Sequence, residues 1–177
     1  MAEHIVLTAI GHDRPGIVDK VSKKVAAHEG NVETSRMARL GGEFAMLALL
    51  TIPDEMIAPL AAALEGLDEE GLFTKVAKTD LVGMAEYQGF LPYEVIVYGA
   101  DHRGIIHEVS HFLAERHINI ESMDTRVTAA PMSGAPLFSL KAVVFAPPDT
   151  TLRMLREELD NVGRLLAVDI DVDPYTG

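Results

Sequence analysis

The sequence predicts an α+β protein made of two tandem units, each with the order strand, helix, strand, strand, helix, strand. Three observations lead to this prediction. A loop near residue 11 returns near residue 99, at a constant offset of about 88 residues, or half the chain. Short β-branched runs alternate with segments in which apolar residues recur at helical spacing. In the first half, a two-glycine turn joins two of the strand-like runs.

The repeat can be read from the residues themselves. Gly11–Val18 reads Gly-His-Asp-Arg-Pro-Gly-Ile-Val, and Gly99–Ile106 reads Gly-Ala-Asp-His-Arg-Gly-Ile-Ile. Two copies are too few for a solenoid, which needs at least about three repeats. We therefore expect two small domains, residues 1–83 and 93–177, joined by a linker at residues 84–92.

Each half begins with a short apolar run, Ile5–Ile10 or Val95–Tyr98, that stops at a glycine and is typical of a buried strand. A helix is expected to follow in both halves. In the first half, Asp13 is expected to cap this helix and Pro15 to fit its first turn. Gly30-Asn31 is expected to end it, because both residues tolerate a positive φ.

The middle of each half is expected to be a β-hairpin. Val32–Leu40 and Phe44–Ile52 flank Gly41-Gly42, a two-residue turn signal. In the second half, Ile120–Thr128 and Leu137–Phe145 take the same places and are joined by a longer loop.

A second helix is expected to open at Pro53-Asp54, and another at residues 148–150. Pro59 is expected to delay the regular part of the first of these two helices. Strands at Phe73–Val82 and Leu165–Val172 are expected to close the two halves. Each half is then a split βαβ, ferredoxin-like unit, with an antiparallel sheet and two helices on one face.

Composition narrows the possible functions. The formal net charge of −12, from 15 basic and 27 acidic residues, weighs against direct nucleic-acid binding, which favours a basic face. The absence of cysteine excludes disulfides, a thiol nucleophile and cysteine-ligated zinc. We expect no signal peptide and no membrane span, and a cytoplasmic location.

The repeated loop has the chemistry of an anion site. A strand ends and a helix begins, which places free N–H groups and the positive end of a helix dipole together. Gly16 and Gly104 have no Cβ, so a ligand can approach the backbone closely. Asp13 or Asp101 could pair with an ammonium group, and the combination suits a free amino acid. The same residues also fit a loop without a ligand, in which Asp caps the helix, Pro starts it and Gly relieves crowding.

These residues carry a resemblance to a known family. Asp13-Arg14-Pro15-Gly16-Ile17-Val18, followed by Asn31-Val32, resembles the ACT domain, whose members typically bind amino acids as regulatory modules. Asp101-His102-Arg103-Gly104-Ile105-Ile106, with Asn119-Ile120, resembles it too, but has no Pro before its Gly. The tandem organisation and the long loop at residues 129–136 resemble the glycine cleavage system transcriptional repressor family. That family is held to act through a partner transcription factor rather than by touching DNA.

The resemblance implies a non-catalytic regulatory protein with no cofactor. It implies a small amino acid as ligand, with glycine or serine suggested by the family, and a protein partner such as a transcription factor. The ligand would lie where the first loop of one unit meets a neighbouring unit. The implied contacts are Asp13, Arg14, Pro15, Gly16, Ile17 and Asn31, with their counterparts Asp101, His102, Arg103, Gly104, Ile105 and Asn119.

Other interpretations stay open. Asn31 and Asn119 also suit ordinary helix-ending positions, and Arg14 and Arg103 also suit a solvated surface. The chain could instead be a regulatory subunit of a metabolic enzyme or a purely structural interaction module. A homodimer is expected in every case, because ferredoxin-like sheets have edges that can pair with another chain.

One motif points to a different function. His107-Glu108-Val109-Ser110-His111 matches the H-E-x-x-H pattern, in which two histidines one helical turn apart bind zinc and the Glu acts as base. Ile106, Val109 and Leu113 are expected to form the buried stripe of this helix, which turns both histidines toward solvent. A catalytic zinc site also needs a third ligand and a cleft, and neither is evident. We therefore expect neither a zinc hydrolase nor a bound metal.

Overall fold

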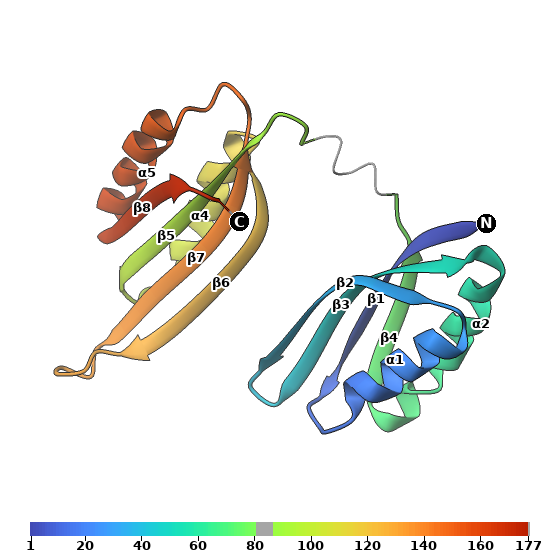
Figure 1. Cartoon of the computed structure of the whole chain (residues 1–177). Coiled ribbons are helices and arrows are strands. Elements are labelled where there is room, and N and C mark those ends of the chain that lie inside the picture. The colour runs from blue at the N-terminus through green and yellow to red at the C-terminus, as the bar shows by residue number, and fades with distance from the viewer. Residues whose placement is uncertain (81–86, 177) are drawn as a thin grey trace. The chain divides into compact units, whose positions relative to one another are not determined.

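Each half of the chain folds as an antiparallel four-stranded sheet with two helices on one face, as predicted (Figure 1). The computed structural model describes residues 1–80 and 87–176, and the chain divides into two units, Met1–Gly83 and Met84–Gly177. The first unit contains β1 (Ala2–His12), α1 (Ile17–Ala27), β2 (Asn31–Leu40), β3 (Glu43–Pro53), α2 (Asp54–Glu65), the short 3-10 helix η1 (Asp68–Glu70) and β4 (Leu72–Lys78). The second contains β5 (Leu91–Ala100), α4 (Ile105–Glu115), β6 (Asn119–Ala129), β7 (Pro136–Ala146), α5 (Leu152–Leu166) and β8 (Val168–Pro174).

The strand order is β2-β3-β1-β4 in the first sheet and β6-β7-β5-β8 in the second. The predicted hairpin is confirmed, because Leu40 pairs with Glu43 across the Gly41-Gly42 turn. Both sheets shift register at the same place, between Val32 and Thr34 in β2 and between Ile120 and Ser122 in β6. The two units therefore match in local irregularities as well as in topology.

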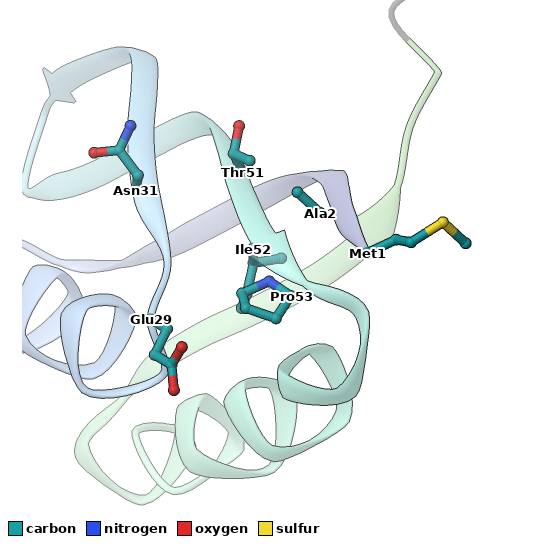
Figure 2. A pocket seen from close by; sticks show the side chains of 7 residues that line it. All are labelled: Met1, Ala2, Glu29, Asn31, Thr51, Ile52 and Pro53. Atoms are coloured by element: carbon teal, nitrogen blue, oxygen red, sulfur yellow. The ribbon is translucent and has the colours of Figure 1, made fainter.

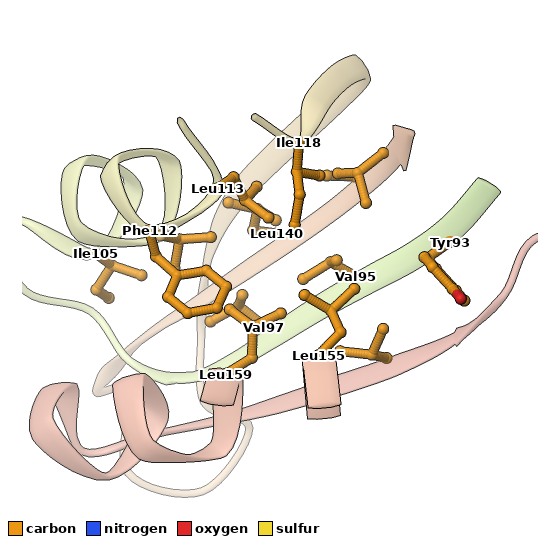
Figure 3. Close-up of a cluster of buried hydrophobic side chains, with 14 of the residues drawn as sticks. Tyr93, Val95, Val97, Ile105, Phe112, Leu113, Ile118, Leu140, Leu155 and Leu159 are labelled. Atoms are coloured by element: carbon orange, nitrogen blue, oxygen red, sulfur yellow. The ribbon is translucent and has the colours of Figure 1, made fainter. Parts of the chain in front are cut away.

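Each unit has its own apolar core between the sheet and its helices. In the first unit, Ile5, Leu7 and Ala9 of β1 lie in the core. The expectation that the apolar run Ile5–Ile10 forms a fully buried strand was wrong for its other face, since Ile10 is 53% exposed. Figure 3 shows the core of the second unit, in which Phe112 and Leu113 of α4 meet strand residues such as Val97. In the described part of the chain, no helix is long and apolar enough to cross a membrane.

The first helix of the first unit begins later than its sequence suggested. α1 starts at Ile17, so Asp13 and Pro15 both precede it, and its N-cap is Gly16 with φ 92°. Asp13 does not cap it, since no described side chain makes a cap hydrogen bond to its first turn. The expectation of a cap from Asp13 and a first turn at Pro15 was wrong, because the glycine takes a left-handed conformation between them and the helix.

The end of α1 also differs from the prediction. The residue with positive φ is Glu29 (φ 59°), and His117 (φ 55°) takes the same place in the second unit. Glycine is needed at position 30 for a steric reason rather than for a positive φ. A Cβ at this position would lie 2.8 Å from Cγ1 of Val25.

Pro59 does not delay its helix, because α2 is regular from Asp54 and contains Pro59. Leu60 and Leu64 are completely buried, which stabilises the helix by about 3–6 kcal/mol and offsets the roughly 3 kcal/mol cost of an interior proline.

The closing strands begin at other residues than expected. β8 begins at Val168 rather than Leu165, since α5 continues through Leu166. β4 spans Leu72–Lys78, so the expected strand does not continue through residues 79–80. Its expected continuation over residues 81–82 lies outside the described residues, as does the linker segment 84–86. β5 already begins at Leu91, within the range expected as linker.

Candidate ligand-binding loops

The two repeated loops have the same backbone geometry. Gly16 has φ 92° and Gly104 has φ 99°, and each is the N-cap of the helix that follows. Beyond its chain neighbours, no described atom lies within 4 Å of the Cβ that either glycine lacks. The glycines are therefore required by backbone conformation, and the space in front of them is open.

A backbone hydrogen bond fixes each loop to the hairpin of its own unit. The N–H of Asp13 donates to the carbonyl oxygen of Gly42 at 2.8 Å, and the N–H of Asp101 donates to that of Pro136 at 3.0 Å. Within the described residues, no side chain caps the first turn of α1 or α4. The first N–H groups of both helices thus remain available to an anion.

The two loop aspartates have different surroundings. The carboxylate of Asp13 lies 3.5 Å from Nε of Arg39, which comes from the hairpin strand β2. Asp101 has no ion pair with any residue in 1–80 or 87–176 and is exposed. An ammonium group would therefore compete with Arg39 in the first unit. In the second unit it would meet a carboxylate whose charge also helps to raise the pKa of His102.

Arg14 is not a free surface residue. Its guanidinium donates to the backbone carbonyl of Glu70 and lies 3.2 Å from the Glu70 carboxylate, which Lys20 of α1 also contacts. The hydrogen bond from Lys20 is the main reason that the pKa of Glu70 lies below its ordinary value. Arg14 thus ties its loop to the segment that leads into β4.

His102, the counterpart of Arg14, has a similar position. Its Nε2 lies 2.7 Å from the carbonyl oxygen of Leu166, and its Nδ1 lies 3.1 Å from that of Arg103. A neutral imidazole can donate only one of these hydrogen bonds. The bonds to the carbonyls of Arg103 and Leu166 therefore raise the pKa of His102. Sequence reasoning missed Glu70 and Leu166, because neither has a motif around it that marks it as a loop anchor.

The remaining loop residues divide into exposed and buried ones. Pro15 is exposed, whereas Ile17 and Ile105 are only 3% and 2% exposed and belong to the two cores. These two isoleucines can offer a ligand their backbone but not their side chains. Arg103 and Gly104 line a groove of about 470 Å³ between α4 and α5.

Asn31 lies elsewhere in the first unit. It lines a pocket of about 420 Å³, together with Glu29, Thr51 and residues at the start of β1 and the end of β3 (Figure 2). Asn31 pairs with Thr51, and Thr51 with His4, whereas the loop follows His12 at the other end of β1. Eight residues of β-strand separate these two levels, which is about 27 Å. Within one unit, Asn31 and the Asp13 loop therefore cannot contact the same small molecule.

The corresponding place in the second unit has aromatic side chains. Asn119 pairs with Phe145, which stands where Thr51 stands in the first unit. The ring of Tyr87 lies 6.4 Å from that of Phe145 and packs edge-on against Phe90 at 5.3 Å. The two asparagines, although repeated in sequence, lie in different surroundings.

The H-E-x-x-H motif lies on α4 with both histidines exposed, as expected. Their rings stack 5.9 Å apart, and Nε2 of His111 lies 3.4 Å from the carboxylate of Glu115. No group of three potential ligands that could hold a metal ion occurs within residues 1–80 and 87–176. The buried stripe of α4 uses Ile105 in place of the expected Ile106, which is 43% exposed.

Comparisons with known proteins agree with the repeat. Models of the ACT domain match residues 3–76 and residues 93–143. The glycine cleavage system transcriptional repressor of Escherichia coli is 28% identical over 151 residues, covering 81% of this chain and 75% of the relative.

Two solved structures resemble the whole chain. An unknown protein from Galdieria sulphuraria has a TM-score of 0.83 at 29% identity, covering 99% of this chain and all of that one. A structure described as a putative glycine cleavage system transcriptional repressor has a TM-score of 0.72 at 26% identity, covering 100% of this chain and 99% of that one.

Proposed function

The chain belongs to the ACT-domain family, with two ACT domains in tandem, and we propose that it is a non-catalytic regulator that binds a small amino acid and signals to a protein partner. The observation that carries the proposal is the geometry shared by the two loops. Each combines an uncapped helix N-terminus, a left-handed glycine with open space in front of it, and an aspartate at the start of the loop.

This geometry suits both charges of a zwitterion. The ligand carboxylate would accept hydrogen bonds from the free N–H groups after Gly16 or Gly104, where the helix dipole favours negative charge. The ammonium group would lie against Asp13 or Asp101. Arg14 and His102 would act as anchors that hold the loops in place, since both already bind the segment before the last strand of their unit.

We further propose that a complete site needs two ACT units. A ligand at the Asp13 loop is too far from Asn31 of the same unit, at about 27 Å. An Asn31 that contacts this ligand would therefore have to come from another copy of the chain.

The partner and the pathway rest on the relatives. The E. coli protein is a glycine cleavage system transcriptional repressor, so we propose glycine or serine as the ligand and control of glycine cleavage as the role. The net charge of −12 favours a transcription factor or another protein as the partner over DNA itself.

A thermal-shift screen against the twenty amino acids tests the proposal. A ligand at a hundredfold excess over its Kd stabilises the folded state by about 2.7 kcal/mol. We expect one or a few amino acids to raise the melting temperature, and Asp13→Asn combined with Asp101→Asn to abolish the effect. Asp68→Asn, a surface carboxylate outside both loops, is the matched control and should keep it.

The absence of any shift at millimolar concentrations, or an unchanged shift in the double variant, would contradict the proposal. Capture of a metabolic enzyme rather than a transcription factor from cell extract would favour the alternative, a regulatory subunit of that enzyme.

A further inference from the structure

The first sheet has one face without a helix, and this face is apolar. Within the first unit, α1 and α2 cover the side of the sheet on which Leu7 and Leu50 are buried, and no described helix covers the other side (Figure 1). We call this other side the open face and define it by the three rows of four residues that cross the sheet through Ala45, Leu47 and Leu49 of β3.

The composition of the open face is unusual for a solvated surface. Of its twelve residues, eight are apolar, two are threonines and two are cations. The largest apolar side chains are well exposed, with Phe73 at 60%, Ile10 at 53% and Leu47 at 49%. The cations, Arg36 and Lys75, lie on the two edge strands, where long side chains can reach water at the rim of an interface.

The second unit provides an internal comparison, because it has the same fold and register. Its equivalent twelve positions, in the rows through Ser139, Lys141 and Val143, hold three apolar residues, two serines and seven charged residues. Phe73 corresponds to Asp169, and Leu47 to Lys141. The fold itself therefore does not require an apolar surface here, and the first unit keeps one for another reason.

The size of the open face fits a protein contact. Four strands about 4.8 Å apart and three rows about 6.8 Å apart give roughly 400 Å² of flat area. Two such faces together bury about 800 Å² before the relief of the side chains is counted, which approaches the roughly 1,000 Å² of a specific interface. The equivalent face of the second unit is a poor partner, because its charged groups would lose water against apolar side chains.

We propose that two copies of this chain associate through the open faces of their first sheets, packed face to face. Such a contact is self-complementary, as a two-fold symmetric dimer requires. It buries Leu47, Ile10 and Phe73 of both copies and leaves Arg36 and Lys75 at the rim. This contact does not depend on the proposed ligand.

Light scattering of the whole chain from about 5 to 200 µM tests the proposal. We expect wild-type protein to be dimeric at the upper concentrations. Leu47→Lys combined with Phe73→Asp should raise the dimer dissociation constant at least tenfold. Both replacements are the residues that the second unit has at these positions, so the fold accommodates them, and circular dichroism verifies this. Ile96→Thr, which gives the second unit the residue of the first (Thr8), is the matched control and should leave the dimer unchanged.

A wild-type protein that stays monomeric at 200 µM would overturn the proposal. A dimer that survives the double variant would also overturn it, because association would then use another surface. Loss of the dimer in the Ile96→Thr control would do the same, since the second sheet would then be involved.

Discussion

Replacing Gly16 with alanine tests whether the loop depends on backbone conformation. Gly16 has φ 92° and open space where a Cβ would lie, so the alanine meets no steric clash. It must still adopt a left-handed conformation, which costs roughly 1–2 kcal/mol for a residue with a Cβ. For a unit of this size, that cost lowers the melting temperature by about 4–16 °C.

The first unit offers a matched control for this substitution. Gly66 has φ −61°, and a Cβ there would have an ordinary contact with the Ala63 carbonyl at 3.5 Å. Gly66→Ala should therefore be neutral or stabilise the unit by about 0.4–1 kcal/mol, because it restricts the unfolded chain. Far-UV circular dichroism reports the unfolding of both units. Tyrosine fluorescence reports the unfolding of the second unit alone, since all four tyrosines lie beyond residue 86.

Equal melting temperatures for Gly16→Ala and wild type would refute this reasoning, because the left-handed conformation would then not be needed. Equal losses for Gly16→Ala and Gly66→Ala would refute it as well. In that case the cost would come from losing any glycine rather than from the sign of φ.

Three further predictions follow from the structure. Because the pKa of His102 is raised in the folded state, its contribution to stability is complete below about pH 6.5 and is lost as pH rises through the higher folded-state pKa. Urea titrations followed by tyrosine fluorescence should show this loss of stability. The variant His102→Gln should remove this pH dependence. Ser35 lines a groove of about 130 Å³ between α1 and β2, and the equivalent residue of the second unit is Met123, which packs against the core. The variant Ser35→Met should fill this groove and stabilise the first unit by about 0.5–2 kcal/mol, as measured by chemical denaturation. His107 and His111 lack a third metal ligand among the described residues. Protein that is washed with chelator and then dialysed against zinc should therefore hold less than one equivalent of zinc by elemental analysis. One full equivalent of zinc would contradict this prediction.

The sequence predicted the topology well because the strongest signals are local. The two-glycine turn between Leu40 and Glu43 fixed the first hairpin. The apolar run Ile5–Ile10 located β1, but it did not show which face of the strand is buried. The ends of helices were predicted less well. Gly16 could be recognised as a glycine, but not as the left-handed N-cap that separates Pro15 from α1.

The boundary between α5 and β8 shows a second kind of error. Leu166 continues the helical spacing of Leu155, Leu159 and Val162. The prediction nevertheless assigned Leu165 and Leu166 to the strand, because an alternating run follows them. Ala167 at φ 53° ends the helix. The helical pattern before such a residue and the alternating pattern after it are both present in the sequence. Only the packed structure shows at which residue the helix ends and the strand begins.

The candidate site was predicted only in part. The loop residues of each copy lie together, because they are adjacent in sequence. The partners of Arg14 and His102 come from 56 and 64 residues away, and no periodicity connects them. The separation of Asn31 from its loop follows from strand register, which the sequence defines only once the sheet order is known.

Amide chemical-shift mapping by NMR tests the central claim most directly. We predict that titration with glycine or serine moves the amide signals of Gly16 and Gly104 and of the residues that follow each of them, with weaker changes at Asn31 or Asn119. Signals that stay fixed in both loops with every amino acid would contradict the assignment of the loops as the ligand site. Signals that move only in the part of the α4–α5 groove away from Gly104, around His111 and Leu165, would contradict it as well.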